Sequence, residues 1–480
     1  MACVDMNQSL EVREGMRERL RAGWRVAREA VRGVERDYTE GPTGHAIVLL
    51  AVPMVLEVAM ESLFAIVDVF FVSRLGADAV ATVGLTESMM TIVYTVAMSL
   101  GIGATAVVAR RIGEKDEDGA ARAAVQALTL GILVALAVGV LGAWQAEWLL
   151  QLMGATPAMI EHARGYTVVM LGANATVTLL FLLNAVFRGA GDAVVAMRIL
   201  WIANAINIVL DPCLIFGLGP FPELGVTGAA VATSIGRGVA VLVQLWVLFS
   251  GRSRVRIQAR HLRVVPEVMW TVCRLTGPGF VQILLDTSSW IGLVRVISSF
   301  GSEALAGYTI GIRMVIFAIY PAWGLSNAAA TMVGQALGAG KPQRAEEAVW
   351  TAGRYNMYLL GTIGVVFLAA APWIVSFFTT EPIIAGHAVA CLRIVSCGFL
   401  FFAYGLVFTQ AFNGAGDPWT PTWINFACFW VWQIPLAWFL AIHLGLGPSG
   451  VYIAITVAFS TLAVVSAVVF RRGAWKTRRV

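Results

Sequence analysis

The chain has 480 residues, of which 58% are hydrophobic and only 13% are charged, and its formal net charge is +5. About a quarter of the residues of a soluble protein are charged, so the composition excludes a water-soluble globular protein. The basic residues gather between apolar runs, which indicates membrane topology and not nucleic-acid binding.

The first 41 residues form a basic segment. Apolar residues recur in this segment at helical spacing, and the arginines lie on the other faces of the predicted helix. The apolar row is Met16, Leu20, Trp24, Ala27, Val31 and Val34. Two interpretations stay open, a helix lying on anionic lipid and a solvated cytoplasmic helix. The charged stretch is too long for a signal peptide.

Twelve apolar runs follow, each about as long as the roughly 20 residues that a helix needs to cross a bilayer. We predict spans near 45–73, 79–109, 121–143, 163–187, 194–218, 226–250, 267–299, 304–337, 348–371, 386–412, 419–444 and 449–470. The predicted fold is an all-α integral membrane protein of 12 transmembrane helices in two six-helix bundles. The domains are a segment 1–41, an N-lobe 42–250, a basic linker 251–266, a C-lobe 267–470 and a basic tail 471–480.

Arginines and lysines concentrate in the first segment, the linker and the tail. Even numbers of spans separate these three segments, so the positive-inside rule places them all in the cytoplasm. We therefore expect a multi-pass protein of the cell membrane, the inner membrane in a bacterial cell, with both termini cytoplasmic.

The two halves repeat with an offset of 225 residues. Pro53 corresponds to Pro278, Gly113 to Gly338, and the segment 189–192 to 414–417, without a gap. Each unit has an even number of spans, so the halves should be related by a pseudo-twofold axis along the membrane normal. Such parallel repeats place the substrate site between the halves. Channels also carry repeats, but no filter-like segment is present.

Three stretches carry a family resemblance, at 53–76, at 187–192, and at 207–212 followed by 225–233. Together they resemble the multidrug and toxic compound extrusion (MATE) family over about residues 42–470. The resemblance implies antiport of cationic or amphipathic organic compounds against sodium or protons.

Charged side chains inside a span are expensive and therefore mark functional hypotheses. The intramembrane acids are Glu57, Glu61, Asp68, Glu87, Asp211 and Asp286. At ~1.5 Å per residue, Asp68 in span one and Asp211 in span five both lie some 7–10 Å below the outer surface. Thr233 in span six has a similar depth, and Asn207 precedes Asp211 by one turn.

This oxygen-rich group predicts a cation-coupling site. It suits Na⁺ at Asp68, Asn207 and Asp211, or a proton, since two close carboxylates cannot both ionise cheaply. The resemblance implies the same three residues and adds Asn184, although its position in span four indicates a more cytoplasmic depth. The repeat places leucine or tryptophan at the matching C-lobe positions, so coupling should belong to the N-lobe.

The remaining acids are candidates for a substrate cavity. Glu61 corresponds to Asp286 in the repeat, and the two can face each other near mid-membrane or serve helix pairing. Glu57 and Glu87 are further candidates with the same alternative. Pro53 inside span one favours a kink and is a candidate hinge, or a static bend.

We therefore predict a secondary antiporter that exports organic cations or amphipathic drugs in exchange for Na⁺ or H⁺. The alternative is a flippase of lipid-linked precursors from the same broad superfamily. No P-loop, zinc motif or catalytic triad is present, so we expect no enzyme activity and no cofactor beyond the coupling ion. The expected partners are small organic compounds and membrane lipid, no nucleic acid, and the chain is expected to be a monomer.

Overall fold

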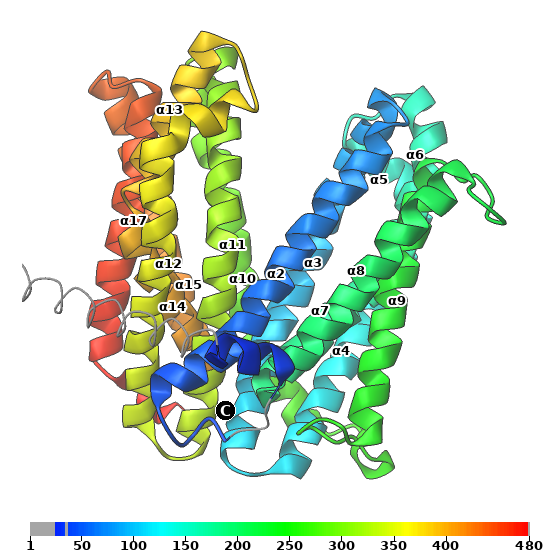
Figure 1. The fold of residues 1–480 in the computed structure, drawn as a ribbon, viewed down its shortest axis with the longest axis vertical. Helices are drawn as coiled ribbons and strands as arrows, with labels where there is room; N and C mark the ends of the chain where they lie inside the picture. The colour runs from blue at the N-terminus through cyan, green and yellow to red at the C-terminus, as the bar shows by residue number, and fades with distance from the viewer. Residues whose placement is uncertain (1–24, 34–36, 479–480) are drawn as a thin grey trace, which may run out of the picture.

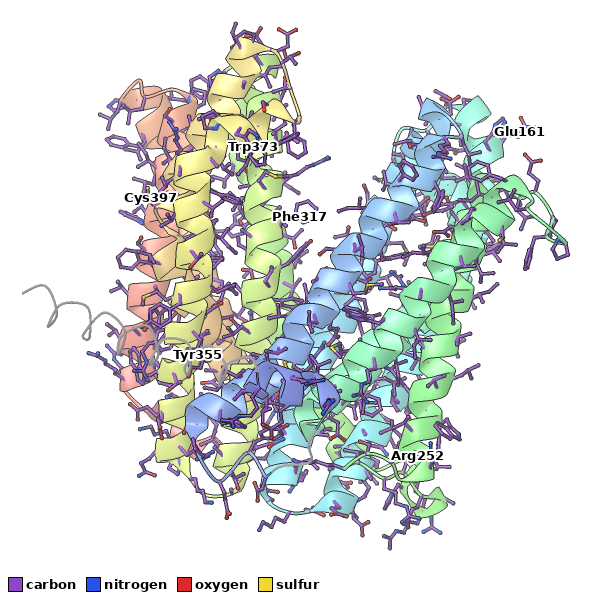
Figure 2. The ribbon with its side chains drawn as sticks, viewed as in Figure 1. Glu161, Arg252, Phe317, Tyr355, Trp373 and Cys397 are labelled. Carbon is purple, nitrogen blue, oxygen red and sulfur yellow. The ribbon has the colours of Figure 1, made fainter. Side chains whose placement is uncertain are left out.

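The computed structural model describes residues 25–33 and 37–478. These residues form helices and connecting turns, with no strand among them. Figure 1 shows two bundles, an N-lobe of α2–α9 and a C-lobe of α10–α17, which meet near the C-terminus and diverge toward the opposite end. We call the end where they meet the closed end; Arg252 marks it on the N-lobe, and Glu161 marks the far end (Figure 2).

The helices keep the order expected from the apolar runs. The N-lobe comprises α2 (Thr43–Ser73), α3 (Ala77–Gly113), α4 (Glu117–Trp144), α5 (Ala146–Leu152), α6 (Pro157–Gly172), α7 (Asn174–Ala190), α8 (Ala193–Phe216) and α9 (Val226–Ser250). The C-lobe comprises α10 (Pro266–Ser298), α11 (Ser302–Gly338), α12 (Pro342–Ser376), α13 (Pro382–Ser396), α14 (Phe399–Gly414), α15 (Trp419–Asn425), η2 (Phe426–Gln433), α16 (Ile434–Trp438), η3 (Phe439–His443) and α17 (Pro448–Arg471). Short 3₁₀ helices, η1 (Ala259–Leu262) and η4 (Ala474–Thr477), lie in the linker and the tail.

Eleven helical stretches of the described chain are long and apolar enough to cross a membrane, and the bent pair α13 and α14 makes a twelfth span. Six fall in each lobe, which confirms the predicted all-α membrane fold. The eleventh span is continuous from Trp419 to His443 but contains two π-helical segments, η2 and η3.

The tenth span, expected as one helix over 386–412, is broken between α13 and α14 by 60°. A Cβ added at Gly398 would lie 3.2 Å from Thr456 Cα, so α17 packs closely against the break. Thr456 Oγ1 also donates to the Ile394 carbonyl, 2.8 Å away. The fourth span is interrupted at Ala173, the repeat equivalent of Gly398. The interruption is therefore a feature of the repeated unit.

At the closed end, α3 and α11 cross with almost no side chain between them. A Cβ added at Gly113 would lie 2.1 Å from the Gln335 carbonyl oxygen, and one at Gly338 would lie 2.2 Å from that of Arg110. The offset of 225 exchanges these two contacts. The crossing therefore lies on the pseudo-twofold axis, and glycine permits this approach because it has no side chain.

The first helix of each lobe begins in the core of the other lobe. Ile47 and Leu50 of α2 are buried in the C-lobe core, and Val272 and Leu275 of α10 are buried in the N-lobe core. These pairs are related by the same offset. The predicted boundaries at 42 and 267 separate the repeats in sequence, but the packed lobes exchange the first turns of these helices.

The N-terminal segment docks on the protein. Residues 25–32 are helical, and Arg198 Nη2 donates to the carbonyls of Val31 and Arg32 at 2.9 and 2.8 Å. Ala30 is buried. Ala30 does not belong to the predicted apolar row, and the side chain of Val31, which does, is 37% exposed, so the segment docks mainly through its backbone. The row members Met16, Leu20, Trp24 and Val34 lie outside the described residues.

The linker and the tail also pack on the lobes. Val255 and Ile257 of the linker are buried in the N-lobe core. Asp192 accepts hydrogen bonds from Ser253 Oγ and the Arg254 amide. In the matching loop of the C-lobe, Asp417 pairs with Arg478 of the tail at 3.4 Å. The repeated glycine–aspartate loops thus anchor the chain that leaves each lobe.

Candidate cation site and the charged residues around it

The predicted cation site comes together inside the N-lobe. Asn207 and Asp211 of α8 are both buried, and Asn207 Nδ2 donates to Thr233 Oγ1 of α9 at 3.1 Å. Asp68 of α2 lies close enough to Asp211 for an electrostatic interaction. Four of the five predicted residues therefore share one region formed by α2, α8 and α9.

Several oxygen atoms of this group lack a hydrogen-bond partner of ordinary geometry in the described part of the chain. They are Asp68 Oδ1, Asn207 Oδ1 and both carboxylate oxygens of Asp211, and all four are buried. Buried polar atoms nearly always have a partner. Unsatisfied oxygens are suited to accept a proton or to coordinate a hard cation, which prefers oxygen ligands.

The donor set of the predicted cation site consists of oxygen atoms, which hard cations prefer. The described residues contain no group of three or more His, Cys, Asp or Glu side chains that could hold a metal ion. Asp68 and Asp211 supply two carboxylates, and Asn207 supplies a neutral amide oxygen. Na⁺ at these three residues therefore stays a prediction consistent with the chemistry of the donors.

Asn184 of α7 contacts different residues. Its Nδ2 donates to Glu57 Oε1 at 3.0 Å, and its Oδ1 accepts from Gln244 Nε2 at 2.5 Å. Glu57 also accepts from Arg188 Nη1 at 2.8 Å. The structure thus places Asn184 and Glu57 together in a polar cluster and does not bring them to the Asn207–Thr233 pair. For Glu57, these contacts correspond to the helix-pairing alternative.

A buried arginine organises the other acids of the N-lobe. Arg237 of α9 pairs with Glu61 at 3.2 Å, and its side chain is only 8% exposed. It also lies near the rings of Phe64 and Tyr94. Glu87 interacts electrostatically with Arg237 and Glu61. Asp68 of the predicted cation site interacts with the same guanidinium. The expected cavity acids Glu61 and Glu87 therefore share a fixed counter-charge with Asp68, which an inventory of acids alone does not reveal.

Arg188 and Arg237 are the functional candidates that the sequence argument missed. Arg188 directly follows the predicted span 163–187, and Arg237 lies inside the predicted span 226–250. A basic residue inside a span carries the same signal as an acid, because it too is costly in lipid. Applying that criterion to both signs of charge would have found Arg237.

Asp286 of α10 is bonded within the C-lobe. Both of its carboxylate oxygens accept from Asn425 Nδ2 of α15, at 2.9 and 3.2 Å. Since Glu61 is paired inside the N-lobe, the two repeat-related acids are each held within their own lobe. For both Glu61 and Asp286, the observed contacts therefore correspond to the helix-pairing alternative.

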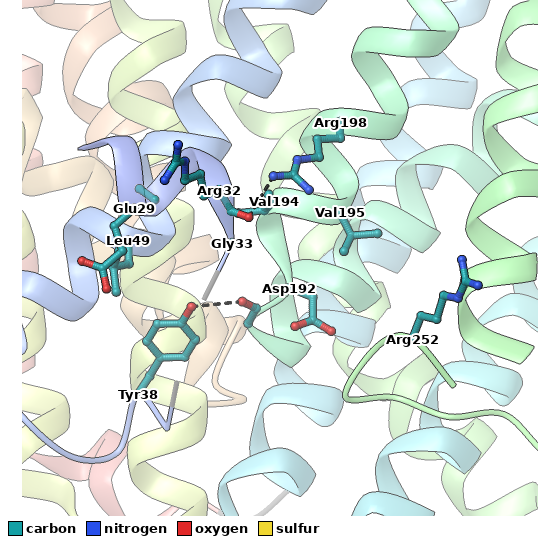
Figure 3. A pocket seen from close by; sticks show the side chains of 12 residues that line it. Glu29, Arg32, Gly33, Tyr38, Leu49, Asp192, Val194, Val195, Arg198 and Arg252 are labelled. Carbon is teal, nitrogen blue, oxygen red and sulfur yellow. Dashed lines mark hydrogen bonds between the residues drawn. The ribbon is translucent and has the colours of Figure 1, made fainter. Parts of the chain in front are cut away.

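A small cavity of about 160 Å³ lies at the closed end between residues 25–33 and α8 (Figure 3). Tyr38 Oη donates to the Gly191 carbonyl at 3.3 Å. Arg32, Arg198 and Arg252 are among the residues that line this cavity. The cavity contains none of the predicted cation-site residues, so it is separate from that site.

Two six-span lobes related by an internal repeat, with buried polar groups inside one lobe, are the architecture of a membrane transporter. The chain belongs to the MatE family, whose model matches residues 53–213 and 278–439, one stretch in each lobe. This family membership confirms the resemblance and identifies a multi-pass membrane transporter, not an enzyme.

Relatives match over most of their length. The chain is 26% identical to the "Probable multidrug resistance protein NorM" of Thermotoga maritima, covering 90% of this chain and 93% of the relative. It is 24% identical to the "FAD transporter" of Shewanella oneidensis, covering 82% and 88%. A solved MOP superfamily transporter from Pyrococcus furiosus has a TM-score of 0.85 and 27% identity, covering 92% of this chain and 98% of that one.

Proposed function

We propose that the protein is a multidrug exporter that exchanges organic cations or amphipathic compounds for Na⁺ or H⁺. The observation that carries the coupling assignment is the set of buried, unsatisfied oxygens on Asp68, Asn207 and Asp211. Relatives named as multidrug resistance or multidrug export proteins support the cargo class. Thr233 positions the Asn207 amide, and the rest of the N-lobe network fixes the helices around it.

The proposed transport cycle follows from this placement. A cation that enters at Asp68 and Asp211 removes repulsion between two carboxylates held on different helices, α2 and α8. The helices can then take a different arrangement, in which the lobes separate at the closed end and come together at the opposite end. The positive-inside rule supports a cytoplasmic closed end, because the linker and the tail lie there. In that orientation the described state is closed to the cytoplasm.

Everted vesicles under separate Na⁺ and proton gradients test the proposal. We expect accumulation of a fluorescent organic cation in vesicles with the unmodified protein under one gradient, and loss of that accumulation in Asp68→Asn and Asp211→Asn. Asp78→Asn is the matched control, since Asp78 is exposed in the first turn of α3. Full driven transport in both site variants would refute the coupling assignment.

A second cargo class is suggested by the relatives, one of which is named as an FAD transporter. The Arg237 guanidinium is buried and its charge is already compensated by Glu61, so the support for an anionic cargo comes from that relative alone. The same vesicles therefore include FAD as an anionic cargo and a labelled lipid precursor. Movement of the lipid headgroup between leaflets without transport of either soluble cargo would favour the flippase alternative.

A further inference from the structure

Helix α2 changes from one lobe to the other near Pro53. Before this residue, Ile47 and Leu50 are buried in the C-lobe core. After it, the Leu56 carbonyl accepts from Trp201 Nε1 of α8 at 3.2 Å, and Val72 is buried in a core cluster of the N-lobe. The first part of α2 therefore packs with the C-lobe, and the part that carries Asp68 packs with the N-lobe.

Glu57 lies directly after this change, one turn beyond Pro53. Its Oε1 accepts from Asn184 Nδ2 and from Arg188 Nη1, both on α7. Its Oε2 is buried and has no hydrogen-bond partner among the residues the structure describes. An unsatisfied buried oxygen weakens the case for a purely stabilising pair, because such an atom keeps its desolvation penalty.

The backbone at Arg188 is also a contact point between the lobes. Thr331 Oγ1 of α11 donates to the Arg188 carbonyl at 3.0 Å. Gln335 Nε2 of the same helix donates to the next carbonyl, Gly189, at 2.9 Å. Arg188 thus contacts α2 through its side chain and α11 of the C-lobe through its backbone carbonyl.

We propose that Glu57 and Arg188 are positioning residues that couple the Asp68-bearing part of α2 to the hydrogen bonds that α11 makes at the closed end. This inference rests on the proposed function, because it assumes that events at Asp68 move that part of α2. When α2 shifts beyond Pro53, Glu57 shifts with it and displaces Arg188. The end of α7 follows Arg188, so the Arg188 and Gly189 carbonyls move away from Thr331 and Gln335, and the lobes can separate at the closed end.

The test uses spin labels at the closed end, on cysteines introduced at Glu117 and Gln343 in a background without the native cysteines. Both positions are exposed, one at the start of α4 and one at the start of α12. The purified full-length protein is measured by double electron–electron resonance. We expect Glu57→Gln and Thr331→Val each to raise the population with separated labels at least about five-fold, a coupling of typical allosteric size. Thr331→Ser keeps the hydroxyl and should resemble the unmodified protein.

The double variant distinguishes coupling from two independent effects. If Glu57 acts through Arg188 on Thr331, then Glu57→Gln combined with Thr331→Val should separate the labels little more than the larger single variant. Multiplying effects would overturn the inference, and so would an unchanged distance distribution in Glu57→Gln. Glu147→Gln is the matched control, since it breaks an exposed arginine pair on α5, which lies at the end of the N-lobe opposite the closed end (Figure 1).

Failure of the proposed function gives a different result. In that case Asp68→Asn retains driven transport in vesicles, whatever the label distances show. Should Glu57→Gln fold poorly, Arg188→Lys serves as the second variant, because it keeps the charge but loses the guanidinium geometry. Arg188→Lys is expected to raise the population with separated labels. Combined with Thr331→Val, it should raise that population little more than the larger single variant does, and a product of the two single effects would again overturn the inference.

Discussion

At the scale of single residues, the N-lobe contains two kinds of intramembrane acid. Asp68 and Asp211 have unsatisfied oxygens and no arginine within salt-bridge distance among the described residues, whereas Glu57 and Glu61 are each paired with an arginine, although Glu57 Oε2 is also unsatisfied. Buried pairs are weak evidence for stability, but breaking one leaves an uncompensated charge. The first kind is therefore suited to bind and release a cation, and the second kind to hold helices in position.

This difference predicts the behaviour of Arg237 variants. Loss of one partner from a fully buried pair costs about 3–5 kcal/mol. Glu61 is 34% exposed, so solvent should reduce the loss for Arg237→Gln to about 1–2 kcal/mol. Thermal unfolding in detergent measures it, and adding Glu61→Gln should restore part of the stability. Arg164→Gln, which breaks an exposed pair with Glu147, should have no effect; equal losses in both would contradict this role for Arg237.

At the scale of helices, the crossing of α3 and α11 is a close backbone-to-backbone contact between the lobes. Gly113 and Gly338 each approach a backbone carbonyl of the other helix, so no flexible side chain can move aside for a larger residue. The contact is made in the described state, in which the lobes meet at this end. Glycine at these two positions therefore favours that state through packing.

The crossing predicts that Gly113→Ala opens the closed end. Its Cβ would lie 2.1 Å from the Gln335 carbonyl oxygen, and overpacking of this kind costs about 1–3 kcal/mol. The spin-label pair at 117 and 343 should report a larger separated population. Gly84→Ala is the control, since its Cβ meets no atom within 4 Å. An unchanged distance distribution in Gly113→Ala would show that the helices accommodate the methyl group.

The helices and the repeat could be predicted because apolar length and a constant offset are properties of the sequence itself. Asp68, Asn207 and Asp211 could be placed together because depth along a span follows from residue number. The sequence does not indicate which faces of the helices pack against each other. The hydrogen bonds of Asn184 to Glu57 and of Asn425 to Asp286 are therefore visible only in the structure. The exchange of Ile47 and Val272 between lobes depends on tertiary packing, which helical periodicity does not encode.

At the scale of the whole molecule, the proposed coupling is asymmetric although the fold is symmetric. The repeat governs the crossing helices, the interrupted spans and the anchoring loops. The C-lobe equivalents of Asp68 and Asp211 are Leu293 and Leu436. The proposed cation site therefore belongs to one lobe, while the symmetric closed end, where the lobes are proposed to separate, is built by both.

The central claim is that cation binding at Asp68 and Asp211 and drug binding are linked. Linkage is reciprocal, so the coupling cation must change drug affinity by the same factor as the drug changes cation affinity. The most direct measurement is the Kd of a fluorescent organic cation for purified protein, titrated at several Na⁺ concentrations and at several pH values. The account predicts that Kd depends on Na⁺ or pH in the unmodified protein and on neither in Asp68→Asn or Asp211→Asn. The same dependence in all three proteins would contradict it.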